Sequence, residues 1–307
     1  MNVIVPGFSG ISVGHVLRLL EPSSFSPDNE KHRRNRGRHL TSVKDMKAKT
    51  FIVGCALALA LLLFAQRHQD SLQAPAFHLV VDLTHTLDAQ TPTYEVSTRP
   101  VYQAKTVATI EKDGYSAREI SLPEHFGTHL DAPAHFARGL WTVDQIPPER
   151  LVAPLVVVDV TAGVNGNPDY QVSVADVAKY EEVHGRIPTN AVVAAHTGWD
   201  SRWNSAKDYR NADANGVMHF PGYSLEAAKF LVEARNVLGL GIDTLSIDYG
   251  PSKDFPVHQY TLSHSLYHLE NVANLEHVPV NGSIVVSAPI KLENGSGGPV
   301  RIFALVR

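Results

Sequence analysis

Cysteine is nearly absent from this chain of 307 residues, which contains one, Cys55. A single thiol excludes an intramolecular disulfide and a zinc site built from several cysteines. The HExxH pattern is absent as well, which excludes the helical zinc-protease arrangement. Any transition-metal site in the chain must therefore be built from carboxylates and from its 16 histidines.

Positive charge is scarce outside the N-terminal segment. Residues 1–65 contain nine Lys and Arg against four Asp and Glu, whereas residues 66–307 contain 18 basic and 27 acidic residues. An acidic surface repels phosphate groups. We therefore expect no nucleic-acid partner, and no anionic membrane partner, for residues 66–307.

A long transmembrane run is also missing from the N-terminal segment. Residues 46–65 combine a basic start with an apolar run of 15 residues from Phe51 to Ala65. A spanning helix needs about 20 apolar residues, so the run is typical of a signal peptide. We expect 46–65 to direct export, as a cleaved signal peptide or as an uncleaved signal anchor that leaves the body outside the cytoplasm. Residues 1–45 are interpreted as a disordered basic segment or a mis-assigned start.

Residues 76–307 alternate between strand-like and helix-like patterns, which predicts a single α/β domain with a mixed, strand-rich sheet. Ser173 and Ser224 are expected N-caps of helices at 173–185 and 223–236. Val-rich and Ala-rich runs are typical of strands buried on both faces. The predicted strands are 78–87, 151–160, 189–200, 237–248, 282–292 and 299–307.

The segment PEHFGTHLDAPAHF, residues 123–136, places His125, His129, Asp131 and His135 within eleven positions. Its Gly127 and a following proline oppose a helix. In an extended chain odd-numbered residues share a face, so a strand or extended loop can direct all four side chains together. The segment therefore predicts a metal-ligand strip, with a solvated histidine-rich loop as the alternative.

Polar residues also follow the predicted strands, where open α/β sheets place their sites. Trp199 follows one strand, Ser246 lies at the end of the next, and a Gly- and Pro-rich loop leads to His258. A flat aromatic wall at Trp199 would suit an aromatic substrate. Both Trp199 and Ser246 can equally be core or strand-end residues, so their contact with substrate is a weaker expectation.

The sequence HFGTHLDAPAHF resembles the HxGTHxDxPxHF signature of the cyclase or kynurenine formamidase-like family of metal-dependent hydrolases, which includes bacterial arylformamidases and isatin hydrolases. A second matching feature is His258 followed twelve residues later by Glu270, in HQYTLSHSLYHLENVANL. The resemblance extends from about residue 80 to 278. It implies a swivelling β/β/α domain and assembly into homo-oligomers.

The resemblance also implies roles for residues. His125, His129 and Asp131 resemble the ligands of one metal ion, and Asp131, His258 and Glu270 those of a second, with Asp131 as the bridge. Nitrogen and carboxylate ligands suit Zn²⁺ or Mn²⁺, one or two per chain. His135 resembles the general base and acid, which takes a proton from a metal-activated water and returns it to the leaving nitrogen.

Two histidines depart from the family pattern. His264 and His268 lie between the candidate ligands, at positions where family members are usually apolar. His268 precedes Glu270 by two residues, so it can replace or compete with it as a ligand; the alternative is a polar face without metal. If Glu270 points elsewhere, the site holds one metal.

The implied activity is hydrolysis of an amide or lactam bond in a small molecule, with an isatin-like or N-formyl arylamine substrate. The alternatives are a lactone hydrolase, an exported small-molecule-binding protein of the same fold without catalysis, and a membrane-anchored structural protein with incidental histidines.

Overall fold

The structure is a computed structural model that describes residues 77–95 and 101–307. The chain divides into two units, residues 1–72 and 73–307, and all described residues belong to the second unit. The predictions for residues 1–45 and 46–65 lie outside the described residues. Within the described part of the chain, no helix has both the length and the apolarity needed to cross a membrane.

The body is built on an eight-stranded sheet that closes on itself, because β4 pairs with both β10 and β12. Strands β5, β7, β9 and β10 run parallel, and the other strands join antiparallel, so the predicted mixed α/β fold is confirmed. The strands of this sheet are β1 (Leu79–Asp82), β4 (His129–Asp131), β5 (Val152–Asp159), β7 (Val192–His196), β9 (Gly239–Ile242), β10 (Tyr267–Glu270), β11 (Ser283–Pro289) and β12 (Gly297–Val306).

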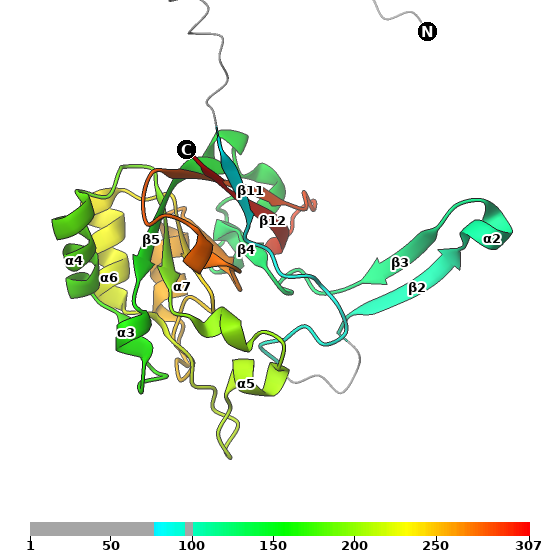
Figure 1. The fold of residues 1–307 in the computed structure, drawn as a ribbon, viewed down its shortest axis with the longest axis horizontal. Helices are drawn as coiled ribbons and strands as arrows, with labels where there is room; N and C mark the ends of the chain where they lie inside the picture. Colours follow the sequence, from blue (N-terminus) through cyan, green and yellow to red (C-terminus); the bar gives the residue numbers. More distant parts are fainter. Residues whose placement is uncertain (1–76, 96–100) are drawn as a thin grey trace, which may run out of the picture. The chain divides into compact units, whose positions relative to one another are not determined.

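Strand β7 and residues 155–158 of β5 are buried on both faces, as their runs of small and β-branched residues predict. Val157 and Ala194 pack in one apolar cluster, whereas Val156 and Val193 pack in a second, against helices α4 and α6. These helices lie side by side over one face of the sheet (Figure 1). The described helices are α2 (Ile110–Asp113), α3 (Thr161–Val164), α4 (Val174–His184), α5 (Ala206–Arg210), α6 (Leu225–Phe230) and α7 (Pro256–Ser263).

The strands at 151–160 and 189–200 and the helices at 173–185 and 223–236 are present where the sequence places them, within a few residues at each end. Ser173 and Ser224 are N-caps, and α6 continues as a π turn, η5 (Leu231–Arg235). The loop predicted to lead to His258 ends before that residue, because helix α7 begins at Pro256. The first residue of a helix is a favoured position for proline, because proline has no N–H to leave unpaired there.

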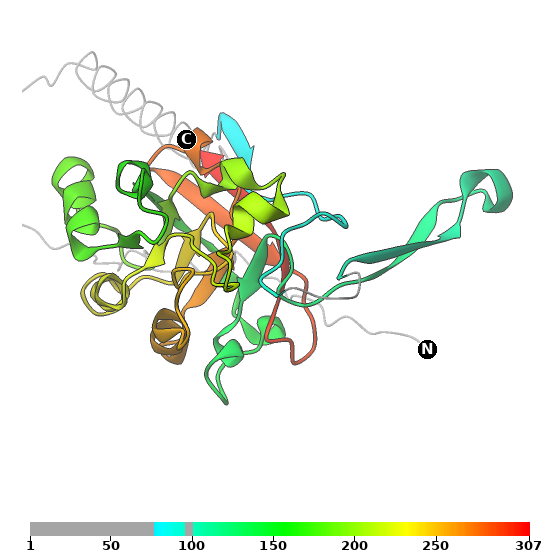
Figure 2. The ribbon, with the colours of Figure 1, turned by 90° about the horizontal axis from the view of Figure 1, so that it is seen from below.

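A hairpin arm, formed by β2 (Gln103–Ala108), α2 and β3 (Ala117–Ser121), extends away from the body in both views (Figure 1 and Figure 2). Four of its large apolar side chains are between 48 and 67% exposed: Val107, Ile110, Tyr115 and Ile120. The remaining short strands, β6 (Gln171–Val172) and β8 (Gly222–Tyr223), pair with each other beside the main sheet.

Candidate metal centre

Strands β4 and β10 carry two cross-strand pairs of polar residues on one face. His268 pairs with Asp131, and Glu270 pairs with His129. Because alternate residues of a strand share a face, both pairs point to the same side. All four side chains are buried, with at most 4% of each residue exposed. Such burial of charged groups is costly unless they pair with each other or bind a cation.

The backbone before β4 fixes the orientation of His129. Gly127 has a φ of +61°, and a Cβ there would lie 2.1 Å from the Leu87 side chain, so the backbone conformation and the close contact both favour glycine. Its carbonyl oxygen accepts a hydrogen bond of 2.8 Å from His129 Nδ1. His129 Nε2 is therefore the nitrogen that faces the carboxylates, and it lies 3.3 Å from Asp131 Oδ1 and 3.4 Å from Glu270 Oε2.

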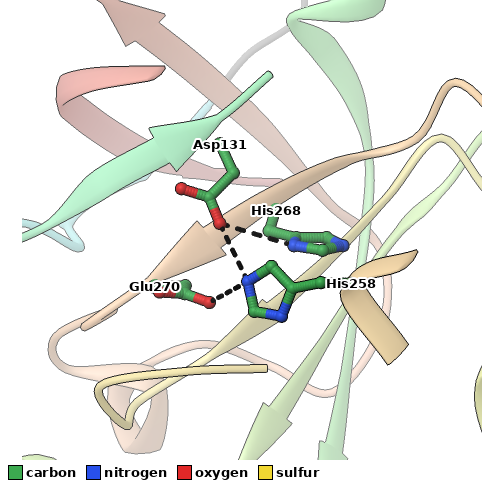
Figure 3. A group of neighbouring side chains, drawn as sticks. All are labelled: Asp131, His258, His268 and Glu270. Carbon is green, nitrogen blue, oxygen red and sulfur yellow. Dashed lines mark ion pairs between the residues drawn. The ribbon is translucent and has the colours of Figure 1, made fainter. Parts of the chain in front are cut away.

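His258 is oriented in a similar way from helix α7. Asp248 accepts hydrogen bonds from the backbone N–H groups of Val257 and His258 and, at 2.8 Å, from His258 Nδ1. The free Nε2 then lies 3.3 Å from Asp131 Oδ2 and 3.2 Å from Glu270 Oε1 (Figure 3). A carboxylate that holds the outer nitrogen of a histidine is typical of metal ligands.

His125 precedes β4 and is half-buried beside these residues. Its Nδ1 lies 2.6 Å from Asp131 Oδ1, and its Nε2 lies 2.9 Å from Ser296 Oγ. The Ser296 hydroxyl donates to Glu124, so it must accept from His125 Nε2–H. The nitrogen of His125 that faces the site is therefore Nδ1.

The two carboxylates share the centre. Burial alone raises the pKa of Asp131, but the four histidine side chains directed at its carboxylate favour the charged form and hold the pKa well below its ordinary range. Glu270 is also buried and lies near Asp131, yet the adjacent His129 and His258 side chains lower its pKa to about 2. Burial opposes the charged form of His129, but the same carboxylates raise its pKa to about 10. The cluster therefore demands positive charge, which protons or a metal cation can supply.

His135 reaches the site by a route that differs from the expected extended strip. Residues 129–131 are extended, but the chain turns at the 3₁₀ helix Pro133–His135 because proline is favoured at the start of a helical turn. The imidazole of His135 stacks on His125, with ring centroids 4.0 Å apart, and its centroid lies 6.1 Å from that of His258. Burial lowers the pKa of His135 to about 4.

The donor set and its spacing fit a metal ion. Tetrahedral ligands at 2.0–2.1 Å from zinc lie about 3.3 Å from each other. The inward-facing nitrogen and oxygen atoms of His129, His258 and the two carboxylates are separated by 3.2–3.4 Å. Asp131 Oδ2 is buried and has no hydrogen-bond partner among the described residues. Two groups place their ligand atoms within 4.8 Å of one another: His125, His129 and Asp131, and Asp131, His258, His268 and Glu270.

A cavity of about 610 Å³ opens above this cluster. His125, His129 and His135 form its polar floor, while Tyr94, Phe136 and Phe255 are among its aromatic walls. Ser246 also lines the cavity, and its buried hydroxyl has no partner among the described residues. The cavity is large enough for a small aromatic ligand.

Trp199 does not line this cavity. It is 2% exposed, its indole N–H donates to the Tyr209 carbonyl oxygen, and it packs with Tyr209 and Phe220 in a separate apolar cluster. The alternative placement in the core matches this geometry. Two orienting residues carry no sequence signal: Ser296, which contacts His125, and Thr261, which contacts His268. Asp248, which orients His258, is the last residue of the strand predicted at 237–248.

The closed mixed sheet and the histidine–carboxylate centre define the class of an α/β protein whose buried side chains could hold a metal ion. The model of the family described as putative cyclase matches residues 81–249. The chain therefore belongs to the putative cyclase family, as its histidine motif predicts.

Named relatives are hydrolases. The isatin hydrolase of Roseibium aggregatum is 30% identical over 242 residues, which cover 74% of this chain and 91% of that protein. The kynurenine formamidase of Salinibacter ruber is 29% identical over 182 residues, 59% of this chain and 76% of that protein. The structure of isatin hydrolase A from Labrenzia aggregata bound to benzyl benzoate has a TM-score of 0.70, with 35% identity and coverage of 74% of this chain and 93% of the other.

Proposed function

We propose that the protein is a metal-dependent hydrolase that opens the amide or lactam bond of a small aromatic molecule, of the isatin or N-formyl arylamine type. The observation that carries the proposal is the common orientation of His125, His129 and His258. Each gives its outer nitrogen to a fixed hydrogen-bond acceptor and presents the other to Asp131 or Glu270 beneath the cavity.

The five residues that would hold the metal are His125, His129, Asp131, His258 and Glu270. A bound Zn²⁺ or Mn²⁺ would supply Lewis-acid activation of water and of the substrate carbonyl. The protein must add a proton acceptor and a pocket that fixes the substrate.

His135 is the candidate proton carrier. Its ring lines the cavity and stacks on His125. Among the described residues neither ring nitrogen has a hydrogen-bond partner, so both are free to exchange a proton with water or substrate. An imidazole nitrogen of His135 takes one proton as the water oxygen bonds to the carbonyl carbon. The carbon–nitrogen bond then breaks, and the same proton passes to the leaving nitrogen.

The aromatic walls support a planar aromatic substrate. Phe136 and Phe255 lie 5.8 Å apart by ring centroids, at the edge of the histidine cluster. Ser246 offers the substrate a hydroxyl with no other partner. A lactone hydrolase would use the same proton transfer and differ only in the leaving oxygen, so an ester substrate belongs in the same assay.

The test measures hydrolysis of isatin, N-formylkynurenine and an aromatic lactone by the purified protein, with and without a chelator. We expect hydrolysis of an amide or lactam, its loss with the chelator, and its return with Zn²⁺ or Mn²⁺. His135→Gln should lower kcat by about 10²–10⁴-fold and retain bound metal. Full activity after complete metal removal would contradict the proposal, and binding of these compounds without turnover would favour a non-catalytic binding protein.

We also propose that the protein is a homo-oligomer in which the hairpin arm packs on a second copy. A two-stranded hairpin is marginal on its own, and Val107 and Ile120 expose apolar surface that a partner would cover. Val107→Asp combined with Ile120→Asp should lower the mass measured by sedimentation, and an unchanged mass would contradict this role.

Export by residues 46–65 is proposed from the sequence alone, and N-terminal sequencing of the native protein distinguishes a cleaved signal peptide from an anchor.

A further inference from the structure

His268 is a fully buried histidine below the cavity. It has 0% exposure, and it is absent from the residues that line the cavity. It lies two positions before Glu270 on β10, so both side chains point to Asp131 and His129 on β4. A buried imidazole at this position must have a partner for each nitrogen or lose the hydration free energy of the unpaired one.

The tautomer of His268 follows from its neighbour Thr261. His268 Nε2 lies 2.7 Å from Thr261 Oγ1. The Thr261 hydroxyl has one hydrogen, which it donates to the Val257 carbonyl oxygen at 2.7 Å, so it accepts from His268 Nε2–H. The other nitrogen, Nδ1, therefore carries a lone pair.

That lone pair faces another acceptor. His268 Nδ1 lies 3.5 Å from Asp131 Oδ2, and neither buried atom has a hydrogen-bond partner among the described residues. Two acceptors in contact away from water repel each other, and a cation between them converts the repulsion into attraction. Figure 3 shows His268 and His258 both directed at this oxygen, with Glu270 beside His258.

We propose that His268 Nδ1 is an additional metal ligand, which completes a closed site with His258 Nε2, Asp131 Oδ2 and Glu270 Oε1. The ligand atoms of these residues lie within 4.8 Å of one another, and three nitrogen–oxygen separations of 3.2–3.5 Å match the edges of a zinc tetrahedron, about 3.3 Å. This inference rests on the proposed function for the presence of the metal.

The two halves of the centre then differ in role. A site with four protein ligands has no open position and is typical of structural zinc, whereas three protein ligands leave a position for water. His125, His129 and Asp131 all line the cavity and supply three ligands, whereas the other group includes His268, which is the one proposed ligand that does not line the cavity. We therefore assign the deeper position to a tightly held ion that positions Asp131, and the cavity-facing position to the exchangeable ion that serves the reaction.

The decisive experiment introduces a thiol ligand at position 268. The Sγ of a cysteine is one bond from Cβ, closer than the Nδ1 of a histidine, but its bond to the metal is longer, about 2.3 Å against about 2.0–2.1 Å. A cysteine at position 268 can therefore bind a metal ion at nearly the same place as His268 Nδ1. Each variant also carries Cys55→Ser, so an introduced cysteine is the single thiol of its chain. His268→Cys loaded with Co²⁺ should show a sulfur-to-cobalt charge-transfer band in the near ultraviolet.

His264→Cys is the matched control. His264 is the other extra histidine of this segment, but it is exposed and its Nδ1 contacts the Tyr260 carbonyl oxygen, so its thiol should give no such band. His268→Leu should weaken the tighter of two Zn²⁺ affinities by at least about 10²-fold in a competition titration, more than the loss of an outer-shell partner. Thr261→Val, which removes only the acceptor for Nε2–H, should weaken it less.

The outcomes separate this inference from the proposed function. Absence of the band in Co²⁺-loaded His268→Cys, with the tighter affinity unchanged in His268→Leu, would overturn the ligand role while hydrolysis by the wild-type protein remained. A band without hydrolysis of any amide, lactam or lactone would uphold the ligand role and overturn the function. If His268→Leu does not fold, the cysteine variant decides.

Discussion

Two clusters of histidine and carboxylate lie at strand ends of the same sheet, and they differ in how their lone pairs are used. One is the metal centre around Asp131; the other groups His196, Asp200 and Asp243 near the ends of β7 and β9. In both clusters the possible ligand atoms lie within 4.8 Å of one another. In the second, however, Asp243 accepts hydrogen bonds from the backbone N–H groups of Thr197, Gly198 and Trp199 and from the Thr197 hydroxyl.

The comparison shows that closeness and residue type do not by themselves mark a metal site. Asp131 Oδ2 and His268 Nδ1 are buried without hydrogen-bond partners, whereas no side-chain atom of the Asp243 cluster is both buried and unpartnered within the described part of the chain. The carboxylate of Asp243 fixes the turn after β7, and that of Asp131 remains available to a cation. We therefore assign the Asp131 cluster a binding role, because its lone pairs are unused, and the Asp243 cluster a structural role.

The two clusters are nevertheless connected. The Tyr209 hydroxyl lies 2.8 Å from the Asp243 carbonyl oxygen and 3.0 Å from Asn271 Oδ1. Asn271 in turn donates to the Gly127 carbonyl oxygen, which also accepts from His129. The hydrogen-bonded turn thus supports the backbone that orients a proposed metal ligand.

The largest expected effect comes from Asp131→Asn. The amide removes the shared negative charge and places N–H donors toward the histidines, so we expect bound metal to fall below one ion per two chains and kcat/KM to fall by at least about 10³-fold. Metal analysis and the hydrolysis assay measure both. Wild-type metal content in this variant would show that Asp131 is not a ligand.

Asp243→Asn should give the opposite pattern. The amide nitrogen would face the N–H groups of Gly198 or Trp199, which would lose a charged acceptor, and we expect a loss of about 2–4 kcal/mol in the free energy of unfolding. Metal stoichiometry should stay unchanged. Denaturant unfolding and metal analysis of the same preparation test this expectation. A variant that loses metal but keeps its free energy of unfolding would contradict the different roles of Asp131 and Asp243.

His85 contacts the segments that carry both clusters. Its backbone N–H donates to Thr128 next to His129, and its ring stacks on Trp203 at 3.9 Å beyond the Asp243-bound turn. Burial lowers the pKa of His85 from 6.5 to about 4. The folded state therefore resists protonation between these values, while the unfolded chain takes up the proton.

The stability that follows has a defined pH window. The contribution of His85 to the free energy of unfolding is fully present above pH 6.5 and is lost as the pH falls toward 4. The loss is roughly 2–3 kcal/mol after allowance for the partial exposure of the ring. Urea unfolding at a series of pH values should show this loss in the wild-type protein and a smaller one in His85→Phe. If the free energy of unfolding falls equally with pH in both proteins, His85 is not the cause of the loss.

His264→Ala should have the smallest effect. Its ring is exposed on the surface next to α7, and surface substitutions of this kind change stability by less than about 0.5 kcal/mol. Hydrolysis and metal affinity should match the wild type. A clear loss of hydrolysis or of metal affinity in His264→Ala would show that His264 contributes to the metal centre.

The sequence predicts the parts of this structure that depend on local pattern. The strands of small and β-branched residues, the Ser-capped helices and the residues of the histidine strip follow from periodicity, capping and spacing. The extended strip fails after Asp131 because Pro133 begins a turn, which brings His135 back against His125. The position of Trp199 depends on packing against Tyr209, which no local pattern contains.

Other features depend on contacts between distant residues. The state of His268 follows from the hydroxyl of Thr261 and the cross-strand position of Asp131, which lies 137 positions earlier in the chain. Ser296, which orients His125, lies 171 positions from it. The hairpin arm has no apolar core of its own, so its sequence carried no core pattern that could reveal it.

Metal content per chain tests the central claim most directly. Elemental analysis of the purified full chain after Zn²⁺ saturation and removal of free ions should give close to two ions in the wild type and in Asp243→Asn, and far less than one in Asp131→Asn. A wild-type protein that retains no transition metal under these conditions would contradict the account.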